Sequence, residues 1–313
     1  MTTNKTNDYQ THQFEMKSDY EGKVVCTLIE HRAKETSKKA LLYLHGFNDY
    51  FFQDHLANWA NDNGLNFYAL ELRKYGRSIL SHQKPNNFKD YKEYFEDIDQ
   101  AIQFIREKEN NEQLVFMGHS TGGLLAVLYA HHHRGDHTID AVILNSPFFE
   151  FNLPAILKNT FVPLMSWLGN SFPNLPSPVG LDKGYGFSLH KSHQGDWDYD
   201  LKLKPDAGFQ IYASWIRGIH LAQQELQKGL SIACPVLVMS SATSVKPGNF
   251  RPEMLHADAV LNVEDIERYA QVIGKHVERT AFEGGLHDLL LSDRKVREKV
   301  LMTMGKFIDK NLA

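Results

Sequence analysis

Residues 118–122 (Gly-His-Ser-Thr-Gly) have the residue types and spacing of a nucleophile elbow, in which a serine hydroxyl can attack a carbonyl group. They follow a short apolar run, residues 114–117, and precede a stretch that predicts a helix over residues 124–132. Because such a turn is tight, only small neighbours fit beside the serine, and a glycine stands two positions away on either side. The helix would add N–H groups and positive potential beneath the hydroxyl. We expect Ser120 to be a nucleophile; the alternative, a glycine-rich loop without chemistry, is disfavoured by the flanking elements.

A serine needs a base within hydrogen-bond reach and a carboxylate that orients the base. His287 is the best base among the sixteen histidines. It follows the last predicted strand, residues 279–282, on a turn with two glycines, and it comes after the serine in the chain, as this arrangement requires. Because the carboxyl ends of parallel strands share one rim of a sheet, we expect His287 to approach Ser120.

The carboxylate is less directly marked. No acidic residue follows at once after the predicted strand 235–239. We interpret residues 240–257 as an insertion that carries the acid outward, so that Asp258, just before a predicted helix over residues 263–272, points back towards His287. Three other acidic residues remain rivals for this position: Glu253, Asp265 and Glu283.

A tetrahedral intermediate needs two N–H donors aimed at its oxyanion. The backbone N–H of Thr121, directly after the serine, is one candidate. The second should come from the loop after the apolar run 40–44, where Gly46 permits a turn that aims the N–H of Phe47 at the site. His45 and Gly46 must also end the predicted strand 40–44, and this structural role is compatible with a role in binding the oxyanion.

Short apolar runs of this kind alternate with helical patterns along the chain, which predicts a mostly parallel sheet with helices on both faces. The predicted strands are residues 23–29, after a polar lead-in, and 40–44, 66–72, 114–117, 141–145, 235–239 and 279–282. The predicted helices are residues 52–63, 90–108, 124–132, 263–272 and 296–311.

The alternation stops after Ser146. We predict that residues 147–230 form an inserted helical cap, with a helix within 206–227, and that residues 1–146 and 231–313 form the core. The entrance of the cap is strongly apolar. It forms either an acyl-chain pocket or a lid that meets lipid, or it packs the cap onto the core, and both interpretations stay open. The apolar residues concerned are Phe148, Phe149, Phe151, Phe161, Leu164, Met165, Trp167 and Leu168.

Composition bounds the function. The chain of 313 residues has a net charge of −4 and no basic tract, which argues against nucleic-acid binding. Two cysteines are too few for a disulfide framework, and residues 1–13 are polar, unlike a signal peptide, so a reduced, cytoplasmic protein is the default expectation. The charge-free stretch 159–181 contains four prolines and predicts no membrane-spanning helix. Three consecutive histidines, 131–133, close a helix and point in different directions, so we expect no metal there.

The chain resembles α/β-hydrolases of the monoacylglycerol lipase and lysophospholipase type, which are related to the serine aminopeptidase group. Four pieces carry the resemblance, and they span nearly the whole core: residues 44–47 (Leu-His-Gly-Phe), 71–78 (Glu-Leu-Arg-Lys-Tyr-Gly-Arg-Ser), 118–123 (Gly-His-Ser-Thr-Gly-Gly) and 285–288 (Gly-Leu-His-Asp). The second piece departs from the family pattern Asp-x-Arg-Gly-x-Gly-x-Ser at Glu71 and Lys74. The insertion before Asp258 departs again, because the family acid stands close behind its strand.

The resemblance implies the α/β-hydrolase fold and hydrolysis of carboxylic esters through an acyl-enzyme, without metal or cofactor. The residues predict the same chemistry, with Ser120 as nucleophile, His287 as base and Asp258 as orienting acid. An ester with an apolar acyl part, monoacylglycerol-like or lysophospholipid-like, is the expected substrate. Two alternatives are an aminopeptidase, which would need acidic cap residues to hold a free amine, and a non-catalytic binding or scaffold protein on the same fold.

Overall fold

The structure is a computed structural model that describes residues 9–312, so the first eight residues of the polar N-terminal segment lie outside it. Its centre is an eight-stranded sheet in the order β1-β2-β4-β3-β5-β6-β7-β8. The pairs β1–β2 and β2–β4 are antiparallel, and the remaining pairs are parallel. The strands are β1 (Gln10–Asp19), β2 (Gly22–His31), β3 (Lys39–Leu44), β4 (Asn66–Glu71), β5 (Gln113–His119), β6 (Ala141–Asn145), β7 (Val236–Ser241) and β8 (Val277–Phe282).

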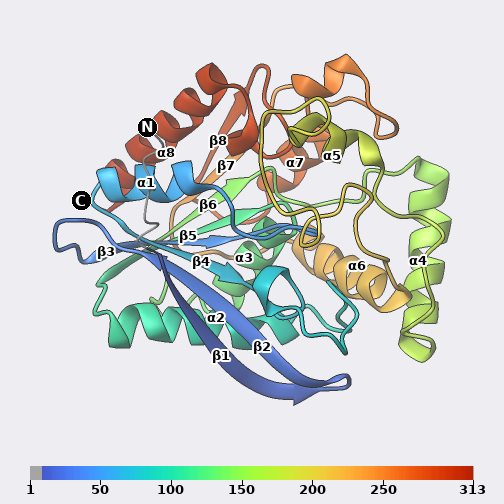
Figure 1. Cartoon of the computed structure of the whole chain (residues 1–313), viewed down its shortest axis with the longest axis horizontal. Coiled ribbons are helices and arrows are strands. Elements are labelled where there is room, and N and C mark those ends of the chain that lie inside the picture. The colour runs from blue at the N-terminus through green and yellow to red at the C-terminus, as the bar shows by residue number, and fades with distance from the viewer. Residues whose placement is uncertain (1–8, 313) are drawn as a thin grey trace.

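Helices cover both faces of this sheet, as the alternation of patterns predicts (Figure 1). The core helices are α1 (Asp54–Asp62), α2 (Glu93–Gln103), α3 (Thr121–His132), α7 (Val263–Ala270) and α8 (Arg294–Asn311). A π-helical turn, Phe104–Lys108, continues α2 to the end of the predicted helix. Apart from β1, each core strand and helix lies within a few residues of its predicted position.

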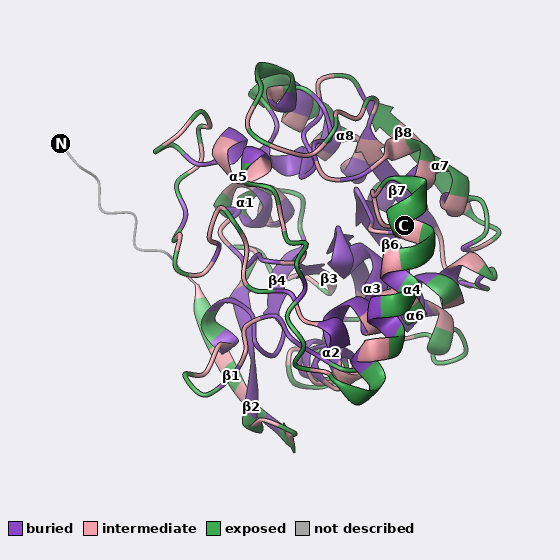
Figure 2. Cartoon of the chain, turned by 90° about the vertical axis from the view of Figure 1, so that its right-hand side faces the viewer, coloured by how far each residue is buried: buried purple, intermediate pink, exposed green. Residues whose placement is uncertain are grey.

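Side chains of β3 alternate between two apolar layers because successive residues of a strand point to opposite faces. Leu41 and Tyr43 pack in the layer that also holds buried residues of α1 and α8. Leu42 and Leu44 pack in the other layer, with buried residues of α2 and α3. Figure 2 shows the central strands almost wholly buried. Two covered faces explain why these strands are uninterrupted apolar runs.

The polar lead-in is where the prediction was wrong, because residues 10–19 form the edge strand β1. Only Met16 in this strand is buried, so its sequence lacks the apolar alternation that reveals a strand. The turn after it is fixed by Lys74, a fully buried residue with a φ of 65°. Its ammonium group lies 2.6 Å from the carboxylate of Asp19 and 2.8 Å from that of Glu21. A position where the family pattern has glycine therefore attaches the β1–β2 hairpin to the loop after β4.

Between β6 and β7 the chain forms three helices that contribute no strand to the sheet: α4 (Ala155–Ser171), α5 (Lys183–Leu189) and α6 (Ala213–Gln227). Figure 1 shows them together on one side of the sheet. The predicted helix over residues 206–227 begins only at Ala213, because Gly208, with a φ of 69°, sits in a turn before it. The buried side of α6 joins the same apolar layer as β5 and α3, so the segment packs directly on the core.

Among the described residues, no helix combines the length and apolar character that crossing a bilayer requires.

Candidate active site

Ser120 stands between the end of β5 and the start of α3, in the strand–turn–helix setting expected of an elbow. Its backbone has φ 51° and ψ −116°, a conformation that costs free energy in a residue other than glycine and that often marks a functional site. A Cβ atom at Gly118 would clash with the backbone of Gly122, and one at Gly122 with the backbone oxygen of His45. The two glycines are therefore required by close backbone approaches, and Ser120 is held in one place.

The loop after β3 lies directly on this elbow. A Cβ atom at Gly46 would come within 3.1 Å of the Cβ of Ser120. His45 fixes the loop, since its Nδ1 donates to the Gly46 carbonyl at 2.8 Å and its Nε2 accepts from the Leu72 N–H at 3.1 Å. Burial lowers the pKa of His45 to about 4, so the ring is neutral and both bonds persist at neutral pH.

The two predicted oxyanion donors flank Ser120 from different elements. The N–H of Thr121 belongs to the first residue of α3, and the N–H of Phe47 belongs to the loop after β3. Neither N–H donates a hydrogen bond elsewhere within residues 9–312. Both donors are thus available to an oxygen atom placed above the serine.

His287 and Asp258 are brought together as predicted. Nδ1 of His287 lies 2.9 Å from Oδ2 of Asp258, and both side chains are buried. The other carboxylate oxygen of Asp258 accepts the N–H groups of Val260 and Leu261 at 2.8 and 2.7 Å. A carboxylate on Nδ1 requires a proton there, which leaves Nε2 of the neutral ring as the free base.

The insertion before Asp258 leaves the sheet and returns to it. Asp258 donates its N–H to Thr243 at 3.0 Å and accepts the N–H of Val245 at 2.9 Å, so it lies beside the residues that directly follow β7. The acid therefore stands behind its strand in space although not in sequence. The three rivals lie elsewhere and make no hydrogen bond to His287: Glu253 and Glu283 are exposed, and Asp265 lies on α7.

The hydroxyl of Ser120 makes no hydrogen bond to His287 among the described residues. His119, the residue before Ser120 in the chain, has its ring centroid 4.9 Å from that of His287. Such serine–histidine bonds are often long in unliganded enzymes and tighten when substrate binds.

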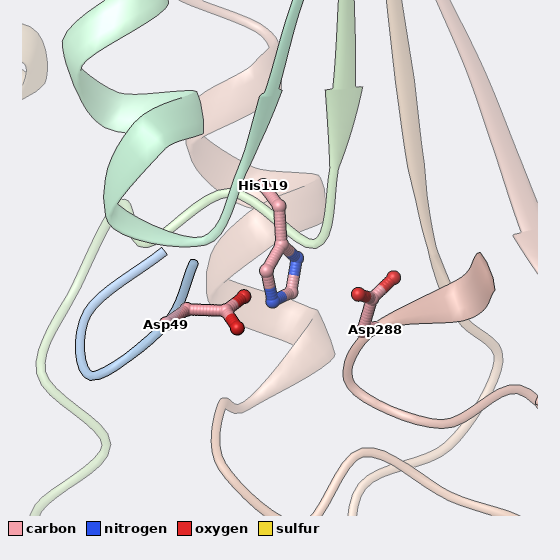
Figure 3. Close-up of side chains that lie close together, drawn as sticks. All are labelled: Asp49, His119 and Asp288. Carbon is pink, nitrogen blue, oxygen red and sulfur yellow. The ribbon is translucent and has the colours of Figure 1, made fainter. Parts of the chain in front are cut away.

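Beside the pair lies a buried polar cluster that the sequence did not reveal: Asp49, His119 and Asp288 (Figure 3). One ligand atom from each lies within 4.8 Å of the others. Burial lowers the pKa of His119, whose Nδ1 donates to the Asn145 carbonyl at 3.1 Å. Oδ1 of Asp49 is paired with Lys204 at 2.6 Å, and Oδ1 of Asp288 accepts from Nδ2 of Asn145 at 2.7 Å. Each carboxylate is thus engaged with a partner outside the three.

The three consecutive histidines serve separate contacts. Nδ1 of His131 accepts the N–H of Ser231 at 3.0 Å. His132 lies 2.6 Å from Glu225, and His133 lies 2.8 Å from Asp136.

A cavity of about 220 Å³ lies between the loop after β3 and the helices between β6 and β7. Phe47 and Tyr185 connect it to the site, because Tyr185 packs edge-on against His287 with ring centroids 5.5 Å apart. Ser120 and His287 themselves do not line it. Its apolar wall includes Phe148, Phe151, Phe161, Val162, Ile211, Trp215 and Leu261.

The mostly parallel sheet, the helices on both its faces and the elbow at the end of β5 define the α/β-hydrolase fold. The family model described as serine aminopeptidase, S33, matches residues 35–294, so the chain belongs to this hydrolase family.

Solved structures with the same fold cover almost the whole chain. A soluble variant of monoglyceride lipase from Saccharomyces cerevisiae in complex with a substrate analog is 17% identical over 96% of this chain and 95% of its own, with a TM-score of 0.67. The monoacylglycerol lipase of Paleococcus ferrophilus is 17% identical over 96% and 99%, with a TM-score of 0.65. A thermostable carboxyl esterase from Bacillus coagulans is 15% identical over 97% and 99%, with a TM-score of 0.66. No curated protein matches the chain in sequence.

Proposed function

We propose that the protein hydrolyses carboxylic esters with an apolar acyl part through an acyl-enzyme. The observation that carries this proposal is the 2.9 Å bond from Nδ1 of His287 to Asp258, formed beside a serine in an elbow conformation. Ser120 Oγ attacks the ester carbonyl while Nε2 of His287 takes the hydroxyl proton. Asp258 holds the imidazole in the required tautomer and stabilises the imidazolium that forms.

The negative charge of the tetrahedral intermediate then falls on the former carbonyl oxygen, where the N–H groups of Phe47 and Thr121 bind it. His287 returns its proton to the leaving alcohol, and the acyl group stays on Ser120. Water repeats the sequence with His287 again as base, and this step releases the acid and restores the hydroxyl.

Residues 147–230 act as the cap in this proposal, and the aromatic wall beneath them receives the acyl chain. The names of the similar structures, monoacylglycerol lipases and an esterase, agree with such a substrate. The outer side of α4 adds a surface for transient contact with lipid, since Ile156, Leu164 and Trp167 are 78%, 53% and 70% exposed. Both cysteines are free, which supports a reducing, cytoplasmic setting.

The test is Ser120→Ala, assayed with p-nitrophenyl esters and with a fluorophosphonate probe. We expect this variant to keep its fold, to lose ester turnover and to escape labelling. Ser231→Ala, an exposed serine outside the site, is the matched control and should behave as the wild type. Turnover retained in Ser120→Ala would falsify the assignment. A wild-type protein that is neither labelled nor active would favour a non-catalytic binding protein.

A serine aminopeptidase is the second candidate, and one observation favours it. Asp182 and Asp206 line the cavity, where a carboxylate can hold the free amine of a peptide. A panel of aminoacyl amides and fatty-acyl esters separates the candidates, and we expect kcat/KM to be higher for the esters.

A further inference from the structure

The loop that carries the first proposed oxyanion donor is bound by a segment from between β6 and β7. We call residues 47–50 the oxyanion loop, because its first residue supplies that donor. Its polar side chains belong to Asn48, Asp49 and Tyr50, and all three are buried. Each hydrogen bond or ion pair that these side chains make within the described chain goes to the segment 200–205. The proposed cap therefore holds this loop in place.

Two of the contacts join consecutive residues on both sides. Nδ2 of Asn48 donates to the carbonyl oxygen of Pro205 at 2.9 Å. Oδ1 of Asp49 is paired with the ammonium group of Lys204 at 2.6 Å. The φ of Asn48 is 52°, a backbone conformation that persists in a residue other than glycine only where the surrounding contacts impose it. The segment 200–205 supplies such contacts.

The ammonium group of Lys204 is committed to this loop. Lys204 is buried, and Asp49 is its only ion-pair partner among the described residues. The rings of Phe52 and Tyr199 lie 5.4 and 5.6 Å from the ammonium group. Neutral residues of similar size often replace a buried ion pair without loss of stability, so the pair is weak evidence for a role in stability alone.

The place of Asp49 in the loop points to a role in catalysis. Its second oxygen, Oδ2, is buried without a hydrogen-bond partner, and in Figure 3 its carboxylate faces the ring of His119. Without Lys204, this carboxylate would move towards water or remain as an uncompensated charge two residues after Phe47. The first change displaces the oxyanion donor, and the second repels the negative charge that develops beside it.

We propose that Lys204 is a positioning residue for the oxyanion loop. Through its ion pair with Asp49 it holds the loop so that the N–H of Phe47 faces the tetrahedral intermediate. The inference rests on the proposed function, because it takes Phe47 to be an oxyanion donor. It adds a second role for the segment 200–205, which completes the active site in addition to covering it.

The test separates positioning from stability with two variants. Lys204→Met leaves the carboxylate of Asp49 uncompensated, whereas the double variant Asp49→Asn/Lys204→Met removes both charges. Both are assayed with p-nitrophenyl butyrate and with a trifluoromethyl ketone as a probe of the oxyanion. Ser120 Oγ adds to the ketone carbon, the hydroxyl proton passes to His287, and the former carbonyl oxygen becomes the oxyanion.

We expect both variants to lower kcat and the affinity for the ketone by about 10²-fold, as loss of one oxyanion donor does. KM should stay unchanged, because the contact acts in the transition state. The double variant should nevertheless regain most of the urea midpoint that Lys204→Met loses, since no uncompensated charge stays buried. Lys191→Met is the matched control and should change none of these quantities, because Lys191 pairs with Asp198 on the surface of the same segment between β6 and β7.

Hydrogen exchange, measured by mass spectrometry, follows the loop without any turnover. In the double variant, exchange should become faster in residues 47–50 and stay unchanged in residues 119–124 of the elbow. A double variant that regains kcat together with stability, or that leaves exchange in the loop unchanged, overturns the proposal. If the wild type hydrolyses esters and the double variant keeps kcat, the positioning role fails alone. If the wild type neither hydrolyses esters nor binds the ketone, the catalytic proposal fails, and exchange still decides whether Lys204 holds the loop.

Discussion

Two histidines with ring centroids 4.9 Å apart have opposite environments. His287 has a carboxylate, Asp258, directly on Nδ1, whereas Nδ1 of the neighbouring His119 donates to a backbone carbonyl. Both rings are buried, and His119 lies near two carboxylates, Asp49 and Asp288. Those two carboxylates are bound by other partners, and burial lowers the pKa of His119.

The comparison shows that a histidine does not become a catalytic base merely by lying near carboxylates. What matters is which ring nitrogen meets the carboxylate and whether that carboxylate is free to stabilise the charged ring. Asp258 has one oxygen on His287 and the other on two backbone N–H groups, so its charge is directed at the ring. In His119 the carbonyl contact fixes the tautomer and offers no charge.

The largest effect is expected when each of the two acids next to these histidines is replaced by asparagine in turn. Asp258→Asn should lower kcat for ester hydrolysis by about 10⁴-fold, because the amide favours the wrong tautomer of His287. Asp288→Asn, one residue beyond the histidine, should retain most of kcat and instead lower the free energy of unfolding by about 1–3 kcal/mol, because its buried hydrogen bonds weaken. Steady-state kinetics and urea unfolding measure the two effects. A reversed pattern would make Asp288 the acting acid.

The second test asks whether burial keeps a histidine of this protein neutral, as it does for His119 in the comparison above. His45, like His119, is buried, and burial lowers its pKa from 6.5 to about 4. Between these values the His45 side chain binds a proton in the unfolded chain but not in the folded protein. The contribution of His45 to the free energy of unfolding therefore falls as pH decreases from 6.5 to 4, and this contribution is constant above pH 6.5. The loss amounts to about 3 kcal/mol. Urea unfolding from pH 7 to pH 4 should show a smaller loss for His45→Gln than for the wild type.

The glutamine variant keeps an acceptor for the Leu72 N–H, so its fold should survive. Replacing the exposed His256 by glutamine is the control and should leave the pH dependence unchanged. Equal slopes for His45→Gln and the wild type would mean that folding does not lower the pKa of His45.

The smallest effect on turnover and stability is expected for a substitution on α4 that changes neither His119 nor His287. Trp167 on α4 is 70% exposed, so Trp167→Ala should change stability by no more than about 0.5 kcal/mol. Turnover of a soluble p-nitrophenyl ester should be unchanged, while binding to lipid vesicles, measured by sedimentation, should weaken about tenfold. Lys306→Ala on α8 is the surface control. Unchanged vesicle binding would remove the lipid contact and leave the site untouched.

The sequence predicted the elements whose signals are local. The strands β2 to β8 and the flanking helices followed from apolar runs and helical spacing, and the elbow followed from glycines that close backbone contacts require. Asp258 was chosen over Glu253 and Asp265, and the structure joins it to His287.

Features that depend on contacts distant in sequence were not predictable. The edge strand β1 is stabilised by pairing with β2 and has one buried residue, so no pattern marks it. The cluster of Asp49, His119 and Asp288 joins the end of β5 to the loop after β3 and the loop after β8. Such groupings become visible only when the polymer is folded.

The buried ammonium of Lys74 has one more consequence. Its compensating charges, Asp19 and Glu21, lie at the turn between β1 and β2, some fifty residues upstream. Removing these two carboxylates while the turn stays in place would leave a positive charge in a dry interior, which costs far more free energy than an ordinary surface substitution. Two acids at the rim of the sheet therefore complete the charge balance of the interior.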